Sequence, residues 1–208
     1  MTYQPLTYVY RAAAAAAAPT LLLLHGTGGD ERDLLPLAPR LAPGFNVLSA
    51  RGNVLEGGMP RFFRRLGLGV FDEEDVVART HELARFLRET SAKEGFDLAH
   101  VVAVGYSNGA NIAGSLLLLH PSLLAGAVLW RPMQPLTRDV PAALPPAAPV
   151  PVLFMPGSHD PTVRPADTAA YAALLAGRGF QLTRHDVAAG HALTETDLAA
   201  AAAWLRHF

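Results

Sequence analysis

The sequence contains no cysteine among its 208 residues, which excludes disulfide bonds, thiolate catalysis and cysteine-ligated metal sites. Charged residues are also sparse, at 17% of the chain, and the formal net charge is -1 at pH 7. A chain without a strongly basic segment has no bulk electrostatic attraction to nucleic acid or to an anionic membrane surface. We therefore expect no nucleic-acid partner.

Long hydrophobic runs are missing as well. The longest apolar stretch, residues 12–24, is interrupted by Pro19 and Thr20 and is too short to cross a bilayer. The first residues lack the basic segment of a signal peptide. We expect a cytoplasmic protein with no membrane span. The alanine-rich residues 12–18 are assigned no role.

Apolar residues are nevertheless abundant enough for a full core. Half of the residues are hydrophobic, which argues against disorder, and 208 residues suit one domain. From Thr20 onward, short apolar runs typical of strands alternate with segments of helical periodicity. This alternation predicts an α/β fold with a mainly parallel central sheet flanked by helices on both faces. We expect residues 1–208 to form this single domain.

One segment combines a strand, a sharp turn and a helix. Residues 101–104 are apolar and mostly β-branched, which favours a buried strand. Residues 105–109 then fit the pattern G-x-S-x-G around Ser107, and residues 111–120 are compatible with a helix. This context is that of a nucleophile elbow, in which a serine hydroxyl stands above the sheet on a strained turn. The alternative is an ordinary turn serine between a strand and a helix.

Polar residues gather after other predicted strands. Residues 25–30, 156–163 and 189–193 each follow an apolar run of strand type. Because the carboxyl ends of parallel strands meet at one edge of a sheet, we expect these segments to lie near Ser107. They supply an acid and a histidine in the chain order that follows a nucleophile elbow.

The candidate catalytic residues are Ser107, Asp160 and His191. A serine hydroxyl is a poor nucleophile until a base removes its proton, and His191 is the candidate base. Asp160 would fix the tautomer of His191 and stabilise the imidazolium. Two alternatives stay open. Asp160 could only open the turn before Pro161, or His159 could be the base, which would leave the acid unassigned.

Backbone N–H groups are the candidates for an oxyanion hole. We expect those of Asn108 and Thr27 to point at the oxyanion that forms when Ser107 attacks a carbonyl. Thr27 belongs to the glycine-rich residues 25–30, where small residues allow close approach of the backbone to a ligand. A phosphate-binding loop is the rival interpretation, but the spacing and the lysine of a P-loop are missing.

Residues 51–71 form a long stretch that is rich in glycine, phenylalanine and methionine. A loop of this length inside a compact domain is usually functional or disordered, and the aromatic content argues against disorder. The segment is either a wall or lid of the substrate pocket or a loop packed on the core. The candidates for an apolar acyl or aryl pocket are Met59, Phe62, Phe63, Phe71, Trp130 and Met133.

The motifs together resemble those of α/β-hydrolases of the carboxylesterase, lysophospholipase and acyl-protein thioesterase group. The matching segments are residues 24–30, 105–110, 157–163 and 190–191, and they span nearly the whole chain. Residues 51–63 resemble a bacterial branch that includes hydroquinone-pathway hydrolases. The resemblance implies an α/β-hydrolase fold and a small cytosolic serine hydrolase with no cofactor or metal. Homodimers are known in the group.

The expected substrate is a small acyl or aryl ester. The thioesterases usually carry glutamine after the serine, whereas this chain has Asn108, which favours small esters over protein deacylation. A deacylase of thioesterase or lysophospholipase type is one alternative. A non-catalytic binding protein of the same fold is the second, although a binding protein has no need of the set Ser107, Asp160 and His191. A different enzyme on the same fold, such as a lyase or a cofactor-free oxygenase, is the third.

Overall fold

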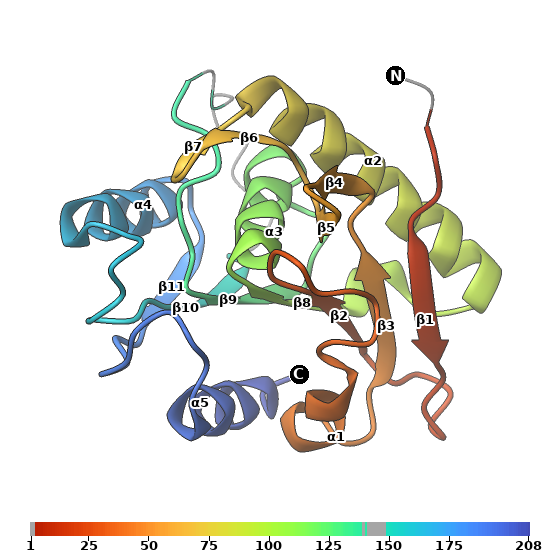
Figure 1. The fold of residues 1–208 in the computed structure, drawn as a ribbon. Coiled ribbons are helices and arrows are strands. Elements are labelled where there is room, and N and C mark those ends of the chain that lie inside the picture. Colours follow the sequence, from red (N-terminus) through yellow and green to blue (C-terminus); the bar gives the residue numbers. More distant parts are fainter. Residues whose placement is uncertain (1–2, 139, 141–148) are drawn as a thin grey trace.

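Figure 1 shows the computed structural model of the protein, in which residues 3–138, 140 and 149–208 are described. A seven-stranded sheet runs through the molecule in the order β1-β3-β2-β8-β9-β10-β11. Its strands are β1 Thr7–Arg11, β2 Thr20–Leu24, β3 Asn46–Arg51, β8 Val101–Tyr106, β9 Gly126–Trp130, β10 Pro151–Met155 and β11 Gln181–Arg184. The edge strand β1 pairs antiparallel with β3, and the other pairs in this sheet are parallel. The predicted mainly parallel sheet is confirmed.

Helices cover both faces of the sheet, as predicted. Three lie on one face, α2 Glu73–Glu94, α3 Asn108–Leu119 and α4 Pro165–Gly177, while α1 Ala38–Leu41 and α5 Glu195–Leu205 lie on the other (Figure 1). Two short 3-10 turns, Leu35–Leu37 and Leu98–His100, complete the helical elements among residues 3–138, 140 and 149–208. No helix in the described part of the chain is long and apolar enough to cross a membrane.

The central strands are apolar at every position because both of their faces are buried. In β2, Leu22 and Leu24 pack in the core beneath α2, α3 and α4, whereas Leu21 and Leu23 pack toward α1 and α5. All four side chains are fully buried. Successive residues of a strand point to opposite faces, so a strand between two helical layers needs an unbroken apolar run.

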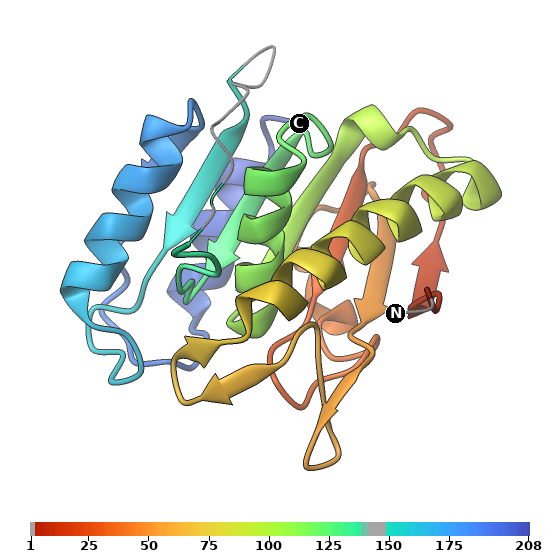
Figure 2. The ribbon, with the colours of Figure 1, turned by 90° about the horizontal axis from the view of Figure 1, so that it is seen from above.

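Residues 52–71 are more regular than the long loop that the sequence predicts. They form two short hairpins, β4 Val54–Glu56 with β5 Met59–Arg61, and β6 Arg65–Gly67 with β7 Val70–Phe71. Strands of two or three residues leave no readable alternation in the sequence, which is why periodicity does not reveal them. Figure 2 shows both hairpins beyond the carboxyl ends of the parallel strands.

The strand order creates a crevice at that same end of the sheet. β2 lies between β3 and β8, and the chain leaves β2 toward β3 but leaves β8 toward β9 on the other side. The connections after β2 and β8 therefore diverge. In open α/β sheets, ligands bind where neighbouring connections diverge in this way.

Candidate active site

Ser107 occupies a strained turn between β8 and α3. Its backbone angles are φ 52° and ψ -112°, a positive φ that a non-glycine residue rarely adopts. The two glycines of the motif make the turn possible. A side chain on Gly105 would collide with the backbone of Gly109, and one on Gly109 would collide with the carbonyl of Leu24. The elbow can form only where both positions lack a Cβ.

The three candidate catalytic side chains lie in one hydrogen-bonded chain, although 84 residues separate Ser107 from His191. The distance from His191 Nε2 to Ser107 Oγ is 2.9 Å, and that from His191 Nδ1 to Asp160 Oδ2 is 2.7 Å. Asp160 follows β10, and His191 lies in the connection between β11 and α5. A carboxylate on Nδ1 favours the tautomer that leaves Nε2 free to accept a proton. Among the described residues, the histidine that is hydrogen-bonded to the Ser107 hydroxyl is His191 and not the alternative base His159.

Asp160 is held in the ionised form by its neighbours. Burial acts to raise the pKa of the Asp160 carboxyl, but hydrogen bonds from Thr162 and His191 outweigh burial and keep that pKa below its ordinary value. The backbone N–H and the hydroxyl of Thr162 both donate to Asp160 Oδ1, at 2.9 and 2.6 Å. The other oxygen, Oδ2, faces His191. The Asp160 carboxylate therefore both supports the turn around Pro161, through Thr162, and contacts His191.

Thr27 and Asn108, whose backbone N–H groups are expected at an oxyanion hole, line the same cavity as Ser107. Asn108 is the first residue of α3, so its N–H has no partner within the helix and lies at the positive end of the helix dipole. The N–H of Thr27 likewise has no acceptor in the described part of the chain. The Asn108 side chain accepts a hydrogen bond from the backbone N–H of Phe62 at 2.7 Å, and its Nδ2 is buried without an acceptor.

The glycine-rich connection after β2 is held by the first hairpin and by His25. The N–H of Gly28 donates to the carbonyl of Pro60 at 2.9 Å. His25 Nδ1 contacts the Gly26 carbonyl at 2.6 Å, and His25 Nε2 accepts from the N–H of Gly52 at 3.1 Å. Burial lowers the pKa of His25, which favours the neutral ring that can donate on one nitrogen and accept on the other. His25 therefore supports the loop.

A cavity of about 260 Å³ opens in front of Ser107. Among the residues proposed for the pocket, Phe71 and Met133 line this cavity. The remaining lining residues from the described chain are Thr27, Arg61, Arg65, Leu68, Gly69, Tyr106, Ser107, Asn108, Asn111, Thr162 and His191. The cavity thus combines apolar side chains with two arginines that were not assigned to it from the sequence.

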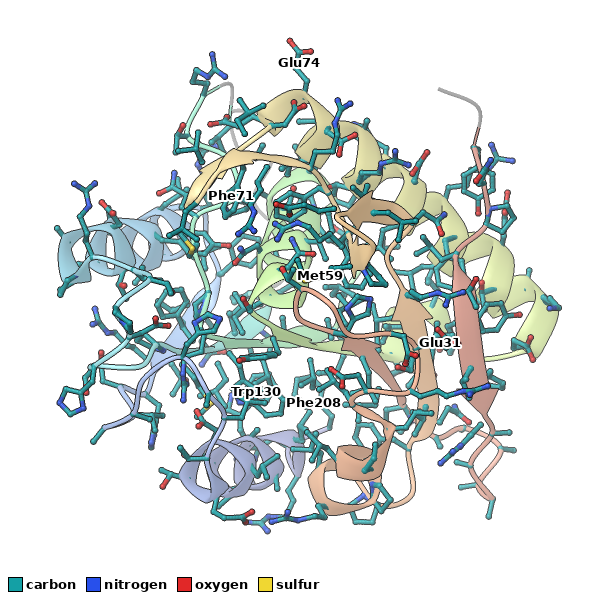
Figure 3. The ribbon with its side chains drawn as sticks, viewed as in Figure 1. Glu31, Met59, Phe71, Glu74, Trp130 and Phe208 are labelled. Atoms are coloured by element: carbon teal, nitrogen blue, oxygen red, sulfur yellow. The ribbon has the colours of Figure 1, made fainter. Side chains whose placement is uncertain are left out.

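Four of the expected pocket residues do not line this cavity. Phe62 and Phe63 are buried in the core, where Phe62 packs on the ring of His25 and Phe63 packs edge-to-face on Phe71. Trp130 is fully buried on the face covered by α1 and α5 (Figure 3). Met59 is 44% exposed on the first hairpin. The composition of residues 51–71 suggested a pocket wall, but it could not distinguish side chains that face the core from those that face the cavity.

Arg131 is a site residue that the sequence analysis missed. It follows β9, has a φ of 53° and is fully buried. Its guanidinium donates to the carbonyls of Gly190 and Ala192, the two neighbours of His191, at 2.8 and 3.0 Å. It also forms a bidentate pair with Asp197 at 2.7 and 2.8 Å. An arginine directly after a fully apolar strand was the available signal, because a buried charge needs a partner.

Metal ligands do not gather in the described part of the chain: no group of three or more His, Asp or Glu side chains there could hold an ion. The site described above brings together side chains and backbone groups of this chain. The chemistry available to this site is that of a serine nucleophile beside a histidine, a carboxylate and free N–H donors.

The sequence and the fold were compared with those of known proteins. The sequence model of a family described as phospholipase/carboxylesterase matches residues 8–208. The Bacillus subtilis (strain 168) protein MhqD, whose name describes it as a hydrolase, is 44% identical over 186 residues, which are 89% of this chain and 92% of MhqD.

Two solved structures of bacterial carboxylesterases are similar over nearly the whole length. The enzyme of Bacillus cereus is 45% identical with a TM-score of 0.92, and the similarity covers 97% of this chain and 94% of that one. The enzyme of Mesorhizobium loti is 34% identical with a TM-score of 0.88 and the same coverage of 97% and 94%.

Proposed function

The chain belongs to the phospholipase/carboxylesterase family, and on that premise we propose that it is a serine hydrolase that cleaves small carboxylic esters through an acyl-enzyme. The observation that carries the proposal is the hydrogen-bonded chain from Ser107 through His191 to Asp160, with contacts of 2.9 and 2.7 Å. Family membership supports the hydrolase activity, and this geometry supports the covalent route.

In the first half of the proposed reaction, Ser107 Oγ attacks the ester carbonyl while His191 Nε2 takes the hydroxyl proton. The carbonyl oxygen becomes an oxyanion, which the N–H groups of Asn108 and Thr27 stabilise. Asp160 stays ionised and stabilises the imidazolium of His191. The protonated His191 then gives its proton to the leaving alkoxide, and the alcohol departs.

The second half releases the acid. His191 removes a proton from water, which attacks the carbonyl carbon of the acyl group, and the bond from that carbon to Ser107 Oγ then breaks. The same oxyanion donors act again, and His191 returns the proton to Ser107 Oγ. The mechanism uses only groups of this chain and water, so it requires no cofactor.

The size and lining of the cavity support a small substrate. A volume of about 260 Å³ fits a short acyl or aryl group better than a long lipid chain. Phe71 and Met133 supply apolar contact surface at the cavity. A thioester of similar size would meet the same nucleophile, so the comparison of an oxygen ester with its thioester distinguishes this alternative.

A panel of p-nitrophenyl esters of rising acyl length tests the proposal. We expect the highest kcat/KM for short acyl groups, and a fluorophosphonate probe should label Ser107 alone. Mass spectrometry after denaturation would locate the label. Labelling at Ser49, Ser115 or Ser158 instead would overturn the assignment of Ser107 as the nucleophile. The absence of both turnover and labelling would favour a non-catalytic protein of this fold.

A further inference from the structure

Two guanidinium groups at the cavity share one carboxylate. Arg61 on β5 and Arg65 on β6 both line the cavity that contains Ser107. Arg65 Nε donates to Glu56 Oε1 at 2.8 Å, and Arg61 Nε lies 3.2 Å from Glu56 Oε2 without the alignment of a hydrogen bond. None of the described residues that line the cavity is acidic. The group therefore carries one positive charge in excess.

The two arginines also have unused donors. Arg61 donates through Nε to the Phe63 carbonyl at 3.1 Å and through Nη1 to the Thr27 hydroxyl at 2.6 Å. In the described part of the chain, no hydrogen-bond acceptor serves Nη2 of Arg61 or either Nη of Arg65. The Arg61 side chain is 3% exposed and that of Arg65 is 26% exposed. Because both side chains line the cavity, these donors are available to an acceptor on a molecule bound there.

A neighbouring arginine shows the opposite arrangement. Arg64 does not line this cavity and pairs with two carboxylates, Asp72 at 2.9 Å and Asp75 at 3.8 Å. The consecutive residues Arg64 and Arg65 therefore differ in their surroundings: Arg64 faces two carboxylates, whereas Arg65 shares a single carboxylate with Arg61. The excess charge is directed to the cavity and is not a general property of the segment.

We infer that Arg61 and Arg65 form a subsite for an anionic group of the substrate, so that the preferred substrates are esters bearing one carboxylate. This inference rests on the proposed ester hydrolysis. Planar guanidinium groups match carboxylate oxygens in charge and geometry. A single excess charge matches a monoanion better than a dianionic phosphate. The apolar side chains Phe71 and Met133 then contact the uncharged part of the substrate.

Matched esters that differ by one charge test the subsite. For an anion on the acyl side, the pair is the 4-nitrophenyl monoester of glutaric acid and that of its monoamide. For an anion on the alcohol side, the pair is 4-carboxyphenyl acetate and 4-carbamoylphenyl acetate. In at least one pair we expect kcat/KM for the carboxylate to be at least roughly 10-fold higher than that for the amide. This ratio corresponds to the free energy of one hydrogen bond to a charged group. Equal values in both pairs would overturn the subsite.

Variants of Arg65 identify the source of the preference, because its side chain is less embedded than that of Arg61. Arg65→Gln should bring the carboxylate-to-amide ratio close to one, and Arg65→Lys should keep part of it. Arg64→Gln is the matched control, since it removes the same charge one residue away, and it should leave the ratio unchanged. Equal loss of the ratio in Arg64→Gln and Arg65→Gln would mean a general field effect and would overturn the subsite.

A binding measurement separates this inference from the proposed reaction. In Ser107→Ala protein, calorimetry should show tighter binding of the glutarate monoester or of 4-carboxyphenyl acetate than of its amide, and adding Arg65→Gln should remove the difference. Preferential binding without turnover by the unmodified protein would reject ester hydrolysis and retain the subsite. Equal binding of acid and amide in both pairs would reject the subsite, whatever the turnover.

Discussion

Two walls of the cavity use their polar groups in different ways. The sheet-end wall consists of the connections that follow β8, β9, β10 and β11, and the hairpin wall consists of residues 52–71. In the sheet-end wall, Asp160 and Arg131 meet partners within the protein at nearly every polar atom. In the hairpin wall, arginine donors stay unused and Leu66, Leu68 and Val70 are more than half exposed.

The two walls are best contrasted through Arg131 and Arg65. All three guanidinium nitrogens of Arg131 donate, and the matching carboxylate of Asp197 is fully buried with it. Arg65 uses one nitrogen and shares its carboxylate with Arg61. A fully satisfied network fixes one geometry, which suits the positioning of a catalytic base. Unused donors suit a group that has still to bind.

The sharpest contrast follows from removing the nucleophile. Ser107→Ala should lower kcat/KM by roughly four to six orders of magnitude for every ester, because the whole chain from Ser107 to Asp160 loses its function. The thermal midpoint should change little, since within the described residues the hydroxyl forms a single hydrogen bond, the one with His191. Steady-state kinetics and a thermal melt measure both. If instead the loss of kcat/KM differs strongly from one ester to another, catalysis and ester selectivity are not separated between the sheet-end wall and the hairpin wall.

Arg131 should affect both stability and turnover, and a double variant separates the two effects. Arg131→Met leaves the Asp197 carboxylate buried and unpaired, at a cost of about 3–5 kcal/mol in the free energy of unfolding. Arg131→Met with Asp197→Asn should recover much of this loss, because no buried charge is left alone.

Turnover should stay low in both of these variants. The carbonyls of Gly190 and Ala192 lose their donor in each, so the loop that carries His191 is no longer fixed. We expect kcat/KM to fall roughly 10- to 100-fold, as for the loss of groups that orient a ligand or base. Urea unfolding and steady-state kinetics test this pattern. Full recovery of turnover together with stability would reduce Arg131 to a structural role.

Acid should weaken the sheet-end wall through Asp160. Its pKa in the folded chain is lower than in the unfolded chain, so its ionised form stabilises the fold. That contribution is complete above the unfolded value of about 3.9 and disappears as the pH falls through the lower folded value. The difference in unfolding free energy between the unmodified protein and Asp160→Asn should therefore shrink between neutral pH and strong acid.

A hairpin variant provides the control for this pH dependence. Phe71→Ala changes no titrating group, so its difference in unfolding free energy should be the same in neutral and acidic urea titrations. If both variants lose their differences in parallel, the acid response belongs to the whole fold. It would then carry no information about Asp160.

Sequence reasoning worked best where a residue's role depends on its own strand. The apolar runs predicted β2, β8 and β10, and the segment after each strand brought Thr27, Ser107 and Asp160 to one edge of the sheet. The role of Arg131 was not predicted because its carboxylate partner Asp197 lies 66 residues away, on a helix whose position depends on the whole topology. Phe62 and Phe63 were misjudged for a related reason. Composition indicates a contact surface, but the register of a short hairpin decides which side chain faces it.

The smallest expected effect concerns Phe71, which lines the cavity. Its comparison is Phe63, which is fully buried and packs on the Phe71 ring at a centroid distance of 5.1 Å. Phe71→Ala should lower kcat/KM for phenyl-bearing esters relative to acetates by about fivefold, the value of one aromatic contact near 1 kcal/mol. Phe63→Ala should instead cost about 3–5 kcal/mol of stability, as core truncations do. Thermal melts and kcat/KM for acetyl, hexanoyl and phenyl-bearing esters compare the two variants. Since Phe63 supports Phe71, a small shift in ester preference in Phe63→Ala is compatible with this division. A larger shift there than in Phe71→Ala would mean that selectivity comes from the core beneath the hairpin wall and not from its surface.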